Sequence, residues 1–96
     1  MADLSRNPTI YNLTLTTAGT EYSQVLLSDA TQPSIKRFQL KSRTSAPLTY
    51  RYISGGFYIT VPADQTKWED GLDAMLLTLF IVGTVNGQVA EIEVWR

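Results

Sequence analysis

The chain has 96 residues and a formal net charge of −1, and it contains neither histidine nor cysteine. A near-neutral charge argues against general affinity for nucleic acid or for anionic lipid. The missing residues are the commonest general base, the commonest metal ligand and the strongest nucleophile, so we expect a protein that is not an enzyme and needs no metal or other cofactor. The length suits one domain, residues 1–96, with residues 1–8 as a flexible N-terminal arm.

Alternating apolar and polar residues, separated by Gly, Pro, Asn and Asp, run along most of the chain and are typical of β-strands and turns. The pattern predicts seven short strands, at residues 11–16, 22–27, 35–41, 48–53, 57–61, 75–84 and 89–95. Pro47 can only precede the fourth strand, because it has no N–H group to donate within a ladder. Seven strands at this spacing predict an all-β fold, either a small antiparallel β-sandwich or a jelly-roll-like barrel.

The connections carry their own predictions. Asn86-Gly87 suits a type I′ turn and predicts a hairpin that joins residues 75–84 to residues 89–95. Residues 64–74 are expected to form the one long loop, with room for no more than a helical turn. Its acidic residues lack the spacing of a calcium-binding loop. Glu91 and Glu93 share one face of the last strand, and we interpret them as edge-strand charges that block aggregation and not as a catalytic pair.

Residues 75–82 do not alternate, and both faces of this strand are apolar. One interpretation is a central strand whose outer face is covered by residues 64–72 or by the N-terminal arm. The other is that Leu76, Phe80 and Val82 face another subunit, which predicts a homo-oligomer, either a dimer or a trimer. The basic residues between 36 and 51 and the acidic residues between 64 and 73 are segregated, so one subunit's basic edge is expected to face a neighbour's acidic loop.

The aromatic residues are the remaining candidates for binding. Trp68 either pins its loop to the core or anchors a partner, and Trp95 either closes the edge of the core or packs on a neighbouring chain. Both therefore join Leu76, Phe80 and Val82 as possible interface residues. A second possible surface, for stacking or polar contact, consists of Tyr50, Tyr52, Tyr58, Arg37 and Arg51. Alternation places Lys36 on the opposite face from Arg37 and Lys41, so a nucleic-acid groove is not expected.

Six segments of the chain resemble those of short virion proteins of tailed bacteriophages. They read NLTL at 12–15, GTEYS at 19–23, IKRFQLKSR at 35–43, FYITVP at 57–62, WEDGL at 68–72 and VAEIEVW at 89–95. The resemblance implies a β-sandwich or jelly roll that sits on the virion as an oligomer, with the major capsid protein as its partner and capsid decoration (cement) as its function. The alternative is a receptor- or carbohydrate-binding module of a tail or fibre, with Tyr50, Tyr52, Tyr58 and Trp68 as a stacking platform. The segments are patterns of strands and turns, so they assign no ligand-binding residue.

Overall fold

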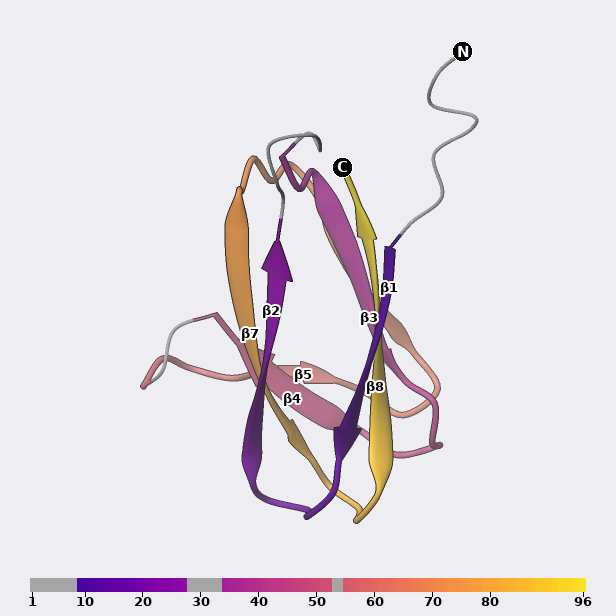
Figure 1. Cartoon of the computed structure of the whole chain (residues 1–96). Helices are drawn as coiled ribbons and strands as arrows, with labels where there is room; N and C mark the ends of the chain where they lie inside the picture. The colour runs from indigo at the N-terminus through magenta and orange to yellow at the C-terminus, as the bar shows by residue number, and fades with distance from the viewer. Residues whose placement is uncertain (1–8, 28–33, 53–54) are drawn as a thin grey trace.

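The computed structural model describes residues 9–27, 34–52 and 55–96 (Figure 1). The segment 1–8, expected to be a flexible arm, lies outside these residues. Within them the chain forms eight strands: β1 (Thr9–Leu15), β2 (Glu21–Leu27), β3 (Arg37–Ser42), β4 (Leu48–Arg51), β5 (Ile59–Val61), β6 (Thr66–Glu69), β7 (Leu76–Gly83) and β8 (Gln88–Trp95). In this part of the chain no helix is long and apolar enough to cross a membrane.

The strands form two antiparallel sheets that face one another. The first sheet has the strand order β1-β8-β3-β6, and the second has the order β2-β7-β4-β5. The predicted all-β fold is confirmed, and it is a small β-sandwich. The additional strand is β6, which lies where a loop with a possible helical turn was expected. Its four residues, TKWE, lack an apolar alternation, and they form a strand because their backbone pairs with β3.

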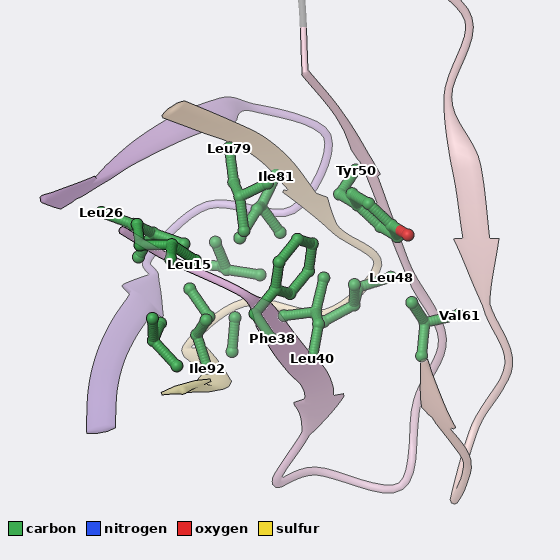
Figure 2. Packing of buried hydrophobic residues seen from close by; sticks show 13 residues of the cluster. Leu15, Leu26, Phe38, Leu40, Leu48, Tyr50, Val61, Leu79, Ile81 and Ile92 are labelled. Atoms are coloured by element: carbon green, nitrogen blue, oxygen red, sulfur yellow. The ribbon is translucent and has the colours of Figure 1, made fainter. Parts of the chain in front are cut away.

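The core lies between the two sheets, and strand alternation explains its composition. On β3, Phe38 and Leu40 point inward and are fully buried, while the intervening residues point outward. Figure 2 shows how side chains from both sheets interdigitate in this layer. The fully buried apolar members are Leu15, Leu26, Ile35, Phe38, Leu40, Leu48, Tyr50, Leu79, Ile81, Ala90 and Ile92, and Val61 and Val94 are nearly so.

The predicted hairpin at Asn86-Gly87 is wrong. β7 and β8 lie in different sheets, so the chain crosses from one sheet to the other between them and forms a β-arch (Figure 1). The chain does turn here, and Gly87 has a φ of 76°, in the left-handed region that glycine tolerates. The turn is not the predicted type I′, however, because that type also needs a positive φ at Asn86, which Asn86 does not have. What the dipeptide does not encode is whether the two flanking strands pair. β1 and β2 are joined by a second arch at the same end of the sandwich, through Gly19.

A buried amide connects the β7–β8 arch to the segment between β3 and β4. Gln88 is fully buried, and its side-chain oxygen accepts hydrogen bonds from the backbone N–H groups of Thr84, at 2.9 Å, and Val85, at 3.4 Å. Its amide nitrogen lies within hydrogen-bond distance of three acceptors: the Ser42 hydroxyl at 2.8 Å and the carbonyls of Ala46 and Pro47 at 3.1 Å each. A buried polar group is tolerated only when it is bonded in this way.

The interpretation of Glu91 and Glu93 as edge-strand charges is also wrong, because β8 is a central strand. It pairs with β1 on one side and with β3 on the other along most of its length. The two carboxylates lie on the outer face of the first sheet. Their side chains are therefore free to contact other residues of that face.

The two arches contact each other through Asn86, and this contact gives a first testable prediction. The Asn86 side-chain oxygen accepts a hydrogen bond of 2.8 Å from the backbone N–H of Ala18. We expect Asn86→Ala to lower the free energy of unfolding by about 1 kcal/mol, because the lost bond is exposed to water. Urea denaturation measures this loss. Asn86→Asp keeps an acceptor oxygen and is expected to retain most of the stability; an equal loss in both variants would contradict the assignment.

Candidate interaction surfaces

The outer face of the first sheet carries an aromatic and arginine cluster at one end. Trp68 from β6 and Trp95 from β8 stack with their ring centroids 5.5 Å apart and their planes at 27°. The guanidinium carbon of Arg37, on the intervening strand β3, lies 4.9 Å from the Trp68 centroid and 4.7 Å from that of Trp95. Cation–π attraction of this kind holds the three side chains together. We call Arg37, Trp68 and Trp95 the tryptophan cluster.

The geometry shows where the two tryptophans lie relative to the core and to solvent. Trp68 does not pin a loop to the core, because it lies on the outer face of an edge strand with 45% of its surface exposed. Trp95 is half-buried, and it packs on Trp68 from the same outer face. In the ladder, Gln39 lies between Trp68 and Glu93, so polar groups border the cluster. The tryptophans are therefore available to a partner only through the exposed part of this cluster.

The other end of the same face is a polar network centred on Glu91. Its carboxylate pairs with Arg43 at 3.0 Å and with Lys41 at 3.2 Å, and Arg43 also donates to the Asn12 side chain at 2.9 Å. The hydrogen bond from Arg43, and then that from Lys41, hold the pKa of Glu91 below its usual value. A lowered pKa in the folded state means that this group stabilises the fold above the unfolded value of 4.5 and loses that contribution as the pH falls.

The network predicts a change in acid stability. Glu91→Gln removes the charge that both cations share, so we expect a small loss of stability at neutral pH and a shallower decline between about pH 5 and pH 3. Thermal melts across this range measure both effects. Glu93→Gln is the matched control on the same strand face, since Glu93 has no hydrogen bond or ion pair among the described contacts. A decline that stays equally steep in Glu91→Gln would contradict the prediction.

The outer face of the second sheet is more apolar. β7 directs Leu76, Thr78, Phe80 and Val82 outward, opposite β2 residues that also point outward. Leu76 is 61% exposed and Val25 on β2 is 42% exposed, while Phe80 and Val82 are half-buried. We call Val25, Leu76, Thr78, Phe80 and Val82 the β7 face. Residues 64–72 do not cover it, since β6 belongs to the other sheet.

A charged cluster borders the β7 face. Arg51 on β4 pairs with Glu21 on β2 at 2.8 Å and lies 4.5 Å from the centroid of the Tyr58 ring. The Tyr58 hydroxyl donates to the same carboxylate of Glu21. This hydrogen bond, the largest of several causes, raises the pKa of Tyr58. Because the cluster spans β2 and β4 on either side of β7, it accounts for the half-buried state of Phe80, which pairs with Arg51 in the ladder.

Phe57 is the exposed residue that sequence reasoning missed. The alternation predicted a strand over residues 57–61, but β5 begins only at Ile59 and Phe57 is 98% exposed. It lies in the connection between β4 and β5, beside Tyr58. The preceding Gly55, with a φ of 88°, was the available signal that the chain is still in a turn at this point.

The second predicted surface does not form as one surface. Tyr50 is fully buried, and its ring makes edge-on contacts with Phe38, at 6.3 Å between centroids, and Tyr52, at 5.8 Å. Arg37 lies on the first sheet, away from Arg51 and Tyr58 on the second. Tyr50 and Tyr52 therefore belong to the core and its margin, and only Tyr58 and Arg51 remain together at the surface. The predicted surface combined residues from both faces of β4, and alternation places Tyr50 inward and Arg51 outward.

The charge segregation that suggested pairing between subunits is accounted for within the chain. All five basic residues between 36 and 51 have an acidic partner in the same molecule: Lys36–Asp73, Arg37–Asp70, Lys41–Glu91, Arg43–Glu91 and Arg51–Glu21. The acidic segment lies beside β3, because β6 pairs with that strand. Each of these basic residues thus has an acidic partner without a neighbouring subunit, and charge pairing between subunits stays a prediction.

Among the described residues, no group of three or more acidic side chains is placed to hold a metal ion. No family model, curated protein or solved structure matches the chain. The structure thus defines the class of molecule, a small antiparallel β-sandwich, and three sets of exposed side chains that its function can use. These are the tryptophan cluster, the β7 face and Phe57.

Proposed function

We propose that this protein is a non-catalytic structural module that binds other proteins through the second sheet, and that it acts as a decoration protein on a phage capsid. The observation that carries the binding role is the concentration of exposed apolar side chains on and beside this sheet. Phe57, Leu76 and Val25 are 98%, 61% and 42% exposed. The capsid as the partner and the virion as the location rest on the sequence resemblance.

Physical reasoning supports this choice of surface. A fully exposed aromatic ring contributes nothing to the stability of the monomer, but such rings are enriched among the residues that dominate binding energy. Burying the exposed apolar side chains against a partner gains roughly 25 cal/mol for each Å² of apolar area, before the cost of association. The bordering Glu21, Arg51 and Tyr58 supply polar groups at the rim, as protein interfaces commonly do.

The test is binding to undecorated shells assembled from the major capsid protein of the same phage. We expect the wild-type protein to sediment with the shells, and Phe57→Ser and Leu76→Asp each to weaken binding by at least about tenfold. Val85→Asp is the matched control, because Val85 is 39% exposed and lies in the arch between β7 and β8, outside the proposed surface. Absence of binding by the wild-type protein, or equal binding by all variants, would refute the proposal.

A second candidate function is favoured by the tryptophan cluster. A half-exposed Trp68 with Arg37 beside it, and with Glu93 across β3 on the same face, has the aromatic surface and the polar neighbours that a sugar ring requires. This arrangement supports the alternative of a receptor- or carbohydrate-binding module, but at Trp68 and Trp95 instead of the tyrosines.

Intrinsic tryptophan fluorescence tests the second candidate. A glycan that stacks on Trp68 is expected to shift or quench the emission in a saturable way, and Trp68→Ala is expected to abolish the response. Trp68→Phe keeps an aromatic surface and is expected to retain weakened binding. An unchanged spectrum across bacterial surface polysaccharides would remove this candidate.

A further inference from the structure

The four edge strands of the sandwich are unequal. β1 and β2 are the edges on one side of the sandwich, and each has seven residues. β5 and β6, the edges on the other side, have three and four residues, and β6 carries Lys67 and Glu69. Short strands and charges are the usual protection of a sheet edge against pairing with another chain. One side of the molecule is therefore protected, and the other is long and open.

β2 has almost none of the protective features. Its sequence, EYSQVLL, contains no proline, no lysine and no arginine, and its single charge, Glu21, is at its first position. It pairs with β7 over seven consecutive residues without an offset, so it has no bulge that would turn the edge away. In an antiparallel ladder, the N–H and C=O groups of every second residue point away from β7, and those of an edge strand have no ladder partner.

β2 is a better candidate for pairing than β1. The start of β1 is flanked by a cation, since Arg96 donates to the Thr9 hydroxyl at 2.6 Å, and Asn12 on its outer face is bonded to Arg43. β2 instead borders the β7 face, to which it contributes the exposed Val25. A strand added at β2 gains backbone hydrogen bonds and buries apolar surface in the same step.

The strand is also complementary to itself. If two β2 strands pair antiparallel about Gln24, all seven residues of each are matched, and residue 23 of one copy faces residue 25 of the other. The two Glu21 residues then lie at opposite ends of the pair, about 20 Å apart, so their charges do not oppose pairing. The inward-facing Tyr22 stands opposite Leu26 of the other copy, and Gln24, which shares their face, stands opposite Gln24 of the other copy at the twofold axis.

We propose that a second copy of this chain binds the free edge of β2. The two β2 strands pair across a twofold axis at Gln24 and join two four-stranded sheets into one continuous sheet. The inference deepens the proposed function, on which it rests, because it specifies how a surface-binding module assembles before it meets its partner. It requires no charge pairing between subunits, which the ion pairs within the chain have already satisfied.

A charge-reversal pair on β2 tests the proposal. Ser23 and Val25 are both exposed, so substitutions there are expected to leave the fold intact. In the proposed register S23K/V25K places lysines opposite lysines at both symmetry-related positions, whereas S23E/V25K places glutamates opposite lysines. By sedimentation at tens of micromolar, we expect wild type and S23E/V25K to be dimers and S23K/V25K to be a monomer with an unchanged circular dichroism spectrum.

Hydrogen exchange supplies a measurement on the unmodified protein. As the concentration rises into the dimeric range, exchange of the β2 backbone amides is expected to slow, while exchange at β1 stays the same. A wild-type monomer, a dimer that protects β1 instead, or equal association of S23K/V25K and S23E/V25K would overturn the proposal.

The two proposals fail separately. Phe57 lies in the connection between β4 and β5 and not on β2, so Phe57→Ser tests shell binding without changing a residue of the pairing strand. A monomer that binds shells would refute the β2 dimer alone. A dimer that does not bind shells would refute capsid decoration alone.

Discussion

Replacing Gln88 with alanine is expected to lower the free energy of unfolding by about 3–5 kcal/mol, a large fraction of the stability of a domain of this size. The substitution removes the side chain's contacts with five groups, which lie in the arch and in residues 42–47. It leaves the Ala46 carbonyl and the Thr84 N–H without this partner, while the Pro47 carbonyl keeps the bond from the Thr84 hydroxyl. It also leaves a cavity between the arch and the residue 42–47 connection. Chemical denaturation should show the loss as a lower midpoint, and a thermal melt as a drop of more than about 12 °C.

Two further variants separate the possible causes of that loss. Gln88→Leu keeps the volume of the side chain but not its hydrogen bonds, and we expect it to be nearly as damaging as the alanine variant. Gln65→Ala changes an exposed glutamine and is expected to alter stability by less than about 0.5 kcal/mol. If Gln88→Leu proved as stable as wild type, packing and not hydrogen bonding would be the role of this residue.

Stability is expected to fall steeply above about pH 10, because Tyr50 in the core and Tyr52 at its margin have raised pKa values in the folded protein. Burial, followed by the hydrogen bond of 2.6 Å from its hydroxyl to Glu69, raises the pKa of Tyr50. Burial and the nearby charge of Glu69 raise the pKa of Tyr52 to about 12. A raised pKa in the folded state means that the contribution is fully present below the unfolded value of 10 and is lost as the pH rises through the folded value.

The loss of stability at alkaline pH (the alkaline limb of the stability curve) follows from the difference in tyrosine pKa between the folded and the unfolded state. Each buried tyrosine that stays neutral in the folded state and ionises in the unfolded state removes about 1 kcal/mol or more for every pH unit above 10. Urea denaturation at several pH values between about 9 and 12 measures the slope, and tyrosinate absorbance reports ionisation directly. Tyr50→Phe is expected to be less stable at neutral pH and to show a shallower alkaline limb. Titration of all five tyrosines as one class near pH 10 in a folded protein would contradict the prediction.

Strand positions and the buried face of most strands were predictable from the sequence, because alternation is a local signal. Phe38 and Leu40 on β3 show this directly, as do Ile92 and Val94 on β8. The pairing of strands was not predictable in the same way. Asn86-Gly87 specifies a turn but not the pairing of the strands that flank it. β8 crosses to the other sheet because it pairs there with β1 and β3, which lie far away in the chain.

The interaction surfaces were predictable only in part. Leu76, Phe80 and Val82 do lie on an outer face, as a strand with two apolar sides required. Trp68 and Trp95 were identified separately, but nothing local says that Arg37 lies between them, since the three residues come from three strands. The ion pairs were missed for the same reason, because each joins residues from segments far apart in the chain. Asp70, which follows β6, pairs with Arg37 on β3, and Glu91 on β8 pairs with Lys41 on β3.

The two β-arches place the last two described strands of the chain at the centre of the sheets. β8 separates β1 from β3, and β7 separates β2 from β4, so Thr9 pairs with Val94 across nearly the whole chain. Until β7 and β8 follow, a chain emerging from the ribosome can form only the β3–β6 and β4–β5 pairs, and β1 and β2 have no ladder partner. Both sheets then close nearly together, after long loops have been ordered at an entropic cost. We expect folding to be slow and to finish only after β7 and β8 have been made. Until then the unpaired strands can aggregate unless the chain is dilute or a chaperone binds it.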